Sequence, residues 1–301
     1  MEKKELKYSL LLLITAAIWG LSFVAQVVGM DSVGALTFNG VRFAIGGLSL
    51  IPVILIFDRK KYTKEERAKL IKYGIILGVV LFAAATLQQF GVLITRSSGR
   101  AGFITGLYIV IVPIMGIFLG RKAGKFTWIG AIFSVTGLYL LSVQDGFGNI
   151  NLGDVLFFIG AFLWATHIMV IDRFAGLVNP IRVSQIQFFT CSAISMICAF
   201  IFEDVTVSSI LDGYLPILYG GVLASGVAYT LQTVGQQHVA PAKAAIIFSL
   251  ESLFAAIGGA ILIHEVMTPR AYVGCAFIFA GIIVSQFKFG GKTPIVDHDK
   301  I

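Results

Sequence analysis

The chain has 301 residues, of which 57% are hydrophobic and only 13% are charged, and its formal net charge is +7. Soluble globular domains carry about 25% charged residues, so this composition excludes an ordinary soluble protein. Lys and Arg cluster in short connections between apolar runs, so the positive charge does not indicate a nucleic-acid-binding surface. The three cysteines fall inside apolar runs without metal-ligand spacing, which predicts no metal site.

The first apolar run follows a basic N-terminal segment and is too long for the hydrophobic region of a cleaved signal peptide, so we interpret it as a retained membrane span. Nine similar runs follow. About twenty apolar residues suffice for a helix to cross a bilayer, where the backbone must satisfy its own hydrogen bonds. The sequence therefore predicts an all-α integral membrane protein with ten transmembrane helices, at residues 8–28, 35–57, 71–94, 101–120, 126–143, 153–172, 183–202, 214–236, 242–263 and 271–288.

The distribution of Lys and Arg predicts the orientation of these helices. If the N-terminus is cytoplasmic, 19 basic residues fall in inner segments and 3 in outer loops. This bias fits the positive-inside rule, so we expect a multi-pass protein of the cell membrane with both termini in the cytoplasm. The longest connection, at 58–72, is expected to be a basic segment at the inner surface that fixes the topology. Contact with anionic lipid is its alternative role.

An internal repeat relates the two halves of the chain with an offset of about 145 residues. Trp19 aligns with Trp164, and Gln88 aligns with Gln232. Self-similarity at a fixed offset indicates that one structural unit occurs twice. The aligned segments are ITAAIWGLSFV (14–24) with IGAFLWATHIM (159–169), VRF (41–43) with IQF (186–188), TLQQFG (86–91) with TLQTVG (230–235), and WIGAIFSVTGLYLLS (128–142) with YVGCAFIFAGIIVSQ (272–286).

Each half, 1–145 and 146–301, holds five predicted helices. Because five is odd, the second half enters the membrane from the opposite side, which produces an inverted repeat. Secondary transporters often have such repeats and bind their substrates near the bilayer midplane, between the two halves. The sequence therefore predicts a carrier that needs no cofactor and is not an enzyme.

Several motifs resemble the two EamA-type repeats of the drug/metabolite transporter superfamily: WGLSF in the first predicted helix, RF at 42–43, ITGLYIVIVPIMG in the fourth and FSLESLFAAIGGAILIHE in the ninth. The resemblance covers nearly the whole chain, although the family often has Glu-Pro where this chain has Glu251 and Ser252. It implies a transporter of small metabolites that works without ATP. We expect efflux of amino acids or related amphipathic solutes and drugs.

Glu251 and His167 are the candidates for proton coupling. Glu251 lies roughly 12 Å along the helix axis from Lys243. A carboxylate facing lipid at that depth is costly, so we expect Glu251 to face the protein interior or a cavity. It would bind a proton, bind a substrate ammonium group or form a structural hydrogen bond. His167 follows Trp164 by three residues and would relay protons or be a satisfied buried side chain.

Aromatic walls with a few polar groups suit amphipathic solutes, and uncharged polar side chains within the spans supply hydrogen-bonding groups. Arg42 would bind a substrate carboxylate, or it would have a structural role by reaching the interface or pairing with Asp31. The structural role is our expectation for Arg42. The predicted substrate-binding residues are Trp19, Asn39, Gln88, Gln89, Tyr108, Trp164, His167, Gln187, Tyr229, Gln232 and Glu251.

Other function classes fit less well. GGKT at 290–293 lacks the first glycine of a phosphate-binding loop, because Gln286 occupies that position. LASG at 223–226 lacks the first glycine of an intramembrane protease motif, and no suitable base accompanies Ser225. A passive channel or facilitator for small solutes is the remaining alternative, although neither a repeated filter loop nor rings of charge support it. The expected partners are a small-molecule substrate, protons and the lipid bilayer, with the protein a monomer or weak homodimer and no nucleic acid bound.

Overall fold

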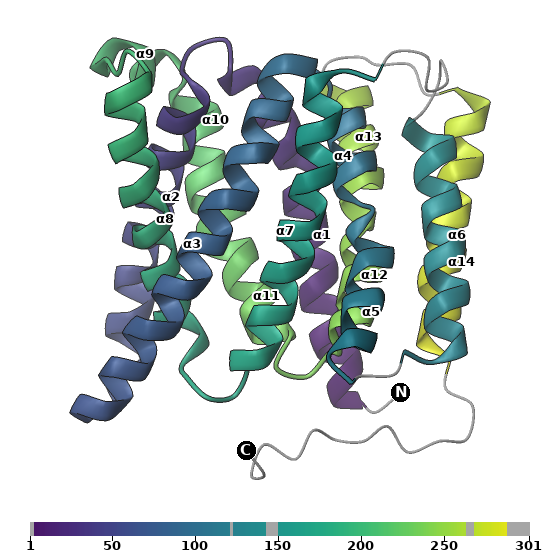
Figure 1. Ribbon diagram of the computed structural model, residues 1–301, viewed down its shortest axis with the longest axis horizontal. Coiled ribbons are helices and arrows are strands. Elements are labelled where there is room, and N and C mark those ends of the chain that lie inside the picture. The colour runs from purple at the N-terminus through teal and green to yellow at the C-terminus, as the bar shows by residue number, and fades with distance from the viewer. Residues whose placement is uncertain (1–2, 121–122, 143–149, 263–267, 288–301) are drawn as a thin grey trace.

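The computed structural model describes residues 3–120, 123–142, 150–262 and 268–287, and every regular element in these ranges is a helix. Figure 1 shows the long helices side by side in a single bundle. The elements are α1 (Lys3–Gly29), α2 (Ala35–Phe57), α3 (Lys64–Thr95), α4 (Ser98–Thr105), α5 (Tyr108–Phe118), α6 (Lys125–Ser142), α7 (Leu152–Phe174), α8 (Pro180–Phe202), α9 (Val207–Asp212), α10 (Tyr214–Leu218), the π-helix η1 (Tyr219–Tyr229), α11 (Thr230–Gly235), α12 (Pro241–Phe248), α13 (Leu250–Leu262) and α14 (Pro269–Gln286).

Eight continuous stretches are long and apolar enough to cross a membrane: α1, α2, α3, α4 with α5, α7, α8, α10 to α11, and α12 with α13. The apolar helices α6 and α14 are shorter. Large apolar side chains such as Leu55, Phe118 and Phe200 are exposed on the outside of the bundle, as expected for helices that contact acyl chains. The all-α membrane class is thus confirmed. Arg121, Lys122 and the GGKT segment of the tail lie outside the described residues.

The third helix begins earlier than predicted, at Lys64 instead of residue 71. The side chain of Thr63 accepts a hydrogen bond from the Glu66 N–H, and the Glu66 side chain accepts one from the Thr63 N–H. This capping box satisfies donors at the helix start, so the charged segment that we expected to be a loop is helical. The connection between α2 and α3 is therefore only residues 58–63.

Three of the predicted membrane helices are interrupted. α4 ends at Thr105 and α5 begins at Tyr108, with Gly106 and Leu107 in a turn between them. Ser249 separates α12 from α13. The eighth predicted helix contains the 11-residue π-helix η1 between α10 and α11. Interruptions of this kind change the local hydrogen bonding of a helix, and π-helical turns are frequent at functional sites.

Helices from the two halves of the chain pack against each other. α2 packs along α8, α3 packs along α7 and α8, and α1 packs along α13 and η1. α6 packs mainly along α14, at one side of the bundle (Figure 1). The α6 and α14 backbones are so close that a methyl group on Gly130 would lie 2.6 Å from the Gly281 carbonyl oxygen, and one on Gly137 would lie 2.5 Å from that of Gly274. Small residues permit this close packing in lipid.

Candidate functional site

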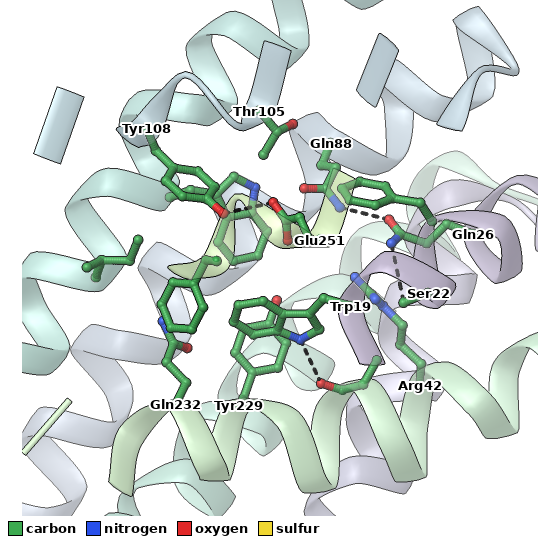
Figure 2. Close-up of a pocket in the computed structure, with 15 residues that line it drawn as sticks. Trp19, Ser22, Gln26, Arg42, Gln88, Thr105, Tyr108, Tyr229, Gln232 and Glu251 are labelled. Carbon is green, nitrogen blue, oxygen red and sulfur yellow. Dashed lines mark hydrogen bonds between the residues drawn. The ribbon is translucent and has the colours of Figure 1, made fainter. Parts of the chain in front are cut away.

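A small cavity lies inside the bundle, between helices of both halves (Figure 2). Its volume is about 40 Å³, which accommodates about three water molecules. The lining combines aromatic rings with uncharged polar groups, one guanidinium group and one carboxylate. Seven of the eleven predicted substrate-binding residues line the cavity: Trp19, Gln88, Tyr108, Trp164, Tyr229, Gln232 and Glu251.

The carboxylate of Glu251 and the hydroxyl of Tyr108 form one wall. Glu251 lies in the first turn of α13 and is only 5% exposed. Tyr108 is the first residue of α5, and its hydroxyl donates a hydrogen bond to Oε1 of Glu251 at 2.9 Å. Two interrupted helices, one from each half, therefore meet through this bond. The expectation that Glu251 faces the interior of the protein is confirmed.

Aromatic rings form a second wall. The ring centroids of Trp19 and Tyr229 are 4.7 Å apart, and those of Trp19 and Phe248 are 5.3 Å apart. Trp164 also stacks on Tyr229, with their ring centroids 6.1 Å apart. The indole N–H of Trp19 donates to the carbonyl oxygen of Ala224, in the middle of η1, at 3.1 Å. The π-helix thus presents a backbone acceptor that orients Trp19.

Ser22 and Gln26 form a polar wall with Gln88. The side-chain amide of Gln88 donates to Oε1 of Gln26 at 2.9 Å, and the Gln26 amide donates to the Ser22 hydroxyl at 3.4 Å. Ser22 and Gln26 are not among the residues predicted from the sequence. Their spacing from Trp19, at i+3 and i+7, places all three on one face of α1 and would have indicated them. The other lining residues that were not predicted are Phe23, Thr105, Ile168, Ala224 and Phe248.

Asn39 and Gln89 are fully buried but do not line the cavity. The amide of Asn39 donates to the carbonyl oxygen of Ala85 at 3.1 Å, and that of Gln89 donates to the carbonyl oxygen of Gln26 at 3.3 Å. These bonds connect α2 and α1 to α3. The structure therefore places both residues in helix packing.

His167 and Gln187 also lie outside the cavity lining. Nε2 of His167 and Oε1 of Gln187 share a hydrogen bond of 3.1 Å between α7 and α8, and both side chains are fully buried. The imidazole lies behind the aromatic wall, edge-on to Trp164 and Tyr229. It therefore packs against the aromatic wall and does not reach the polar groups that line the cavity.

Arg42 lines the cavity and does not pair with Asp31. Its side chain is only 2% exposed; Nε donates to Oδ1 of Asn39 at 3.0 Å, and the guanidinium lies 4.6 Å from the Phe43 ring centroid. Asp31 instead accepts a hydrogen bond from Arg96 at 2.6 Å. Pairing with Asp31, one of the two structural alternatives considered for Arg42, does not occur, because Arg42 lies about two turns inside α2, whereas Asp31 precedes that helix.

Three cavity-lining side chains contain a buried polar atom with no hydrogen-bond partner among the described residues. These atoms are Nε1 of Trp164, Oε1 of Gln232 and Oγ1 of Thr105. A buried group without a partner costs about 1–3 kcal/mol. The arrangement thus offers a bound molecule an aromatic surface, unused donors and acceptors, and two ionisable side chains, which suits a small amphipathic solute.

Comparison with known proteins agrees with this architecture. The sequence profile described as EamA-like transporter family matches residues 6–143 and again 151–287. A transporter of Archaeoglobus fulgidus is 29% identical over 286 residues, covering 95% of this chain and 87% of the relative. The threonine/homoserine exporter RhtA of Escherichia coli (strain K12) is 24% identical over 300 residues. The matched region covers 96% of this chain and 94% of the exporter.

A crystal structure of a protein with 17% sequence identity has the same fold, with a TM-score of 0.76 over 93% of this chain and 96% of that one. The likeness to the relatives extends over nearly the whole sequence, and the family profile matches once in each half. The chain is thus a membrane transporter and belongs to the EamA-like transporter family.

Proposed function

We propose that the protein is a secondary active transporter that moves small amphipathic metabolites, amino acids among them, across the cell membrane by alternating access, with export as its direction. The observation that carries this proposal is the buried cavity between the two halves, where polar atoms that have no partner among the described residues lie beside aromatic rings. The name of RhtA, a threonine/homoserine exporter, supports the cargo class and the direction.

The proposal includes ten membrane-spanning helices in two inverted halves, 1–145 and 146–301, with both termini in the cytoplasm. The α6–α14 contact supports this symmetry. In the repeat alignment Gly130 corresponds to Gly274, and Gly137 corresponds to Gly281. The observed contacts join Gly130 with Gly281 and Gly137 with Gly274, so a two-fold rotation would exchange them. In Figure 1, α1 and α7, the first helices of the two halves, begin at opposite ends of the bundle.

The size of the cavity favours a mechanism of alternating access and argues against an open pore. A volume of about 40 Å³ is far below the roughly 300–1,000 Å³ of pockets that hold small molecules. The halves must therefore separate before cargo enters. Three helix interruptions lie around the cavity: between α4 and α5, at Ser249 and in η1. Bending of the helices at these points would widen the cavity.

We assign proton coupling to Glu251. Its carboxylate is in the cavity wall and accepts a bond from Tyr108. An ionisable group inside a membrane protein commonly marks a proton or substrate pathway. His167, the other candidate, is bonded to Gln187 behind the aromatic wall, so we do not include it in the coupling site.

The test is counterflow of radiolabelled L-threonine in proteoliposomes that contain the full-length protein, with and without a pH gradient. We expect saturable counterflow, accelerated by the gradient, and a loss of both rate and pH dependence in Glu251→Gln. Glu66→Gln, at the start of α3 and outside the cavity, is the matched control. An unchanged rate and pH profile in Glu251→Gln would exclude Glu251 as the coupling site. Unitary currents without counterflow would identify a channel.

A further inference from the structure

A buried cation and a buried carboxylate line the same cavity without pairing with each other. Arg42 reaches it from α2, and Glu251 reaches it from α13. The hydrogen-bond partner of Glu251 is Tyr108, and that of Arg42 is Asn39; no ion pair joins Arg42 to a carboxylate among the described residues. Charges buried without a counter-charge are costly inside a protein and in a membrane. The arrangement therefore indicates a binding partner that the chain itself does not supply.

The guanidinium of Arg42 is held in one orientation. Nε donates to Oδ1 of Asn39, and Asn39 is fixed in turn because its amide donates to the Ala85 carbonyl oxygen. The rings of Phe43 and Phe38 lie 4.6 and 5.5 Å from the guanidinium carbon. These contacts leave the two Nη groups for another partner, and Figure 2 shows the guanidinium pointing towards the cavity near Ser22. Two parallel N–H groups on a fixed guanidinium match the geometry of a carboxylate.

Several acidic side chains elsewhere in the bundle already have cationic or backbone partners. Asp31 is bonded to Arg96, and Asp154 is bonded to Arg100. Glu203 caps the first turn of α2. Among the carboxylates that the structure describes, only Glu251 shares the cavity with Arg42. Glu251 is itself bonded to Tyr108, so a carboxylate on the bound molecule would supply the counter-charge that Arg42 lacks among the described residues.

We propose that Arg42 is the carboxylate-binding residue of the transport site, and that the cargo is an α-amino acid whose ammonium group lies at Glu251. This inference rests on the proposed transport function and narrows its cargo to a zwitterion. A zwitterion compensates both buried charges at once, whereas a cationic or uncharged solute leaves the guanidinium without a counter-charge. The rings of Trp19 and Tyr229 would contact the apolar part of the amino acid.

The first test uses the unmodified protein and changes the ligand. Purified full-length protein is screened by thermal shift against the twenty standard amino acids, because a ligand that binds the folded state raises its stability. The tightest-binding amino acid is then compared with its methyl ester, which lacks the carboxylate charge, and with its N-acetyl derivative, which lacks the ammonium group. We expect each derivative to bind at least about tenfold more weakly.

The second test changes the residue. Arg42→Gln should weaken binding of the amino acid by about 10- to 100-fold and leave the affinity for its methyl ester within about twofold, since the ester does not engage the guanidinium. Arg96→Gln removes an arginine bonded to Asp31 outside the cavity and is the matched control. If Arg42→Gln does not fold, the unmodified protein still tests the inference. Comparing the amino acid with its methyl ester and its N-acetyl derivative shows whether the cargo is bound as a zwitterion.

Three results would overturn the inference: no standard amino acid binds, the ester binds as tightly as the acid, or Arg42→Gln weakens acid and ester equally. Its failure can be separated from failure of the proposed function. Counterflow of the cation tetraphenylphosphonium without amino-acid binding would leave a transporter whose cargo is not a zwitterion. Amino-acid binding without counterflow would leave the site and reject the carrier.

Discussion

The carboxylate of Glu203, which follows α8, holds Thr37 in the first turn of α2, accepting bonds from its N–H at 2.8 Å and its hydroxyl at 2.7 Å. At the other end of the same helix pair, Asp58, which follows α2, binds Arg182 in the first turn of α8. Glu203 lies 145 residues after Asp58, and Arg182 lies 145 residues after Thr37. The two contacts occupy equivalent positions in the repeats, so α2 and α8 are fastened at both ends. We expect them to move as one unit during transport.

Replacing Glu203 should loosen one end of this helix pair. Glu203→Ala removes the acceptor for the N–H groups of Leu36 and Thr37 and should lower the free energy of unfolding by about 1–3 kcal/mol. The measurement is denaturation in detergent monitored by circular dichroism. Asp204→Asn changes the exposed neighbouring acid and should have little effect. Equal stability of the two variants would contradict the capping role of Glu203.

The contact between Asp58 and Arg182 at the other end makes stability depend on pH. Burial opposes ionisation of Asp58, but hydrogen bonds from Arg182 and Tyr62 outweigh it and hold the pKa of this carboxyl below its ordinary value. A lowered pKa in the folded state stabilises the protein at pH values above the ordinary carboxyl pKa of about 4. This contribution is lost as the pH falls through the folded-state pKa.

Asp58→Asn should therefore lower the melting temperature at pH 7, and its difference from the unmodified protein should shrink as the pH falls below about 4. Glu65→Gln, in an exposed pair with Lys69, should follow the unmodified protein at every pH. A difference for Asp58→Asn that stays constant from pH 7 to pH 3 would show that the charge of Asp58 does not stabilise the fold.

The Tyr108 hydroxyl should matter for both transport and folding. Tyr108→Phe keeps the ring and removes the donor to Glu251. Loss of this bond leaves a buried acceptor unsatisfied, so it should slow counterflow about tenfold and lower the free energy of unfolding by about 1–3 kcal/mol. Tyr73→Phe, on a ring that stacks on Phe174 outside the cavity, is the control. Unchanged counterflow in Tyr108→Phe would remove this bond from the mechanism.

The glycine contacts between α6 and α14 should not tolerate a methyl group. A Cβ at Gly137 would lie 2.5 Å from a backbone oxygen of Gly274, which cannot rotate away. Gly137→Ala should therefore destabilise the protein, by about 1–3 kcal/mol. Gly160→Ala is the matched control, because a Cβ there would come no closer than 3.8 Å to its neighbour Leu87. It should be neutral or slightly stabilising through helix propensity. Equal effects of the two substitutions would reject the close contact.

The sequence predicted the helical spans because bilayer thickness and backbone hydrogen bonding constrain their length so strongly. It misplaced the start of α3, since the capping box of Thr63 and Glu66 was hidden in a segment interpreted as a charged loop. It also did not predict the π-helix η1. The carbonyl groups of this element accept bonds from Thr15 and Trp19 of α1, contacts that no local pattern in residues 219–229 reveals.

Some of the cavity-lining residues were predicted from the sequence because lipid excludes charged and polar groups. A charge in an apolar run, such as Glu251, indicates an interior position because lipid excludes it. Amide side chains give a weaker signal: Gln88 lines the cavity while the adjacent Gln89 binds a backbone carbonyl group of α1. Neighbouring residues on a helix point in different directions, and only the packing of α3 against α1 decides which one reaches the site.

Cysteine labelling of equivalent connections in the two halves is the sharpest test of whether they are inserted in opposite directions around a shared site. In a background without Cys191, Cys198 and Cys275, single cysteines replace Lys61, between α2 and α3, and Ser208, in α9. Both positions are exposed, and Figure 1 shows α9 and the α2–α3 connection at opposite ends of the bundle. A membrane-impermeant maleimide should label the cysteine at 208 in intact cells and the cysteine at 61 only in inside-out vesicles. Labelling of both from the same face would contradict the inverted arrangement.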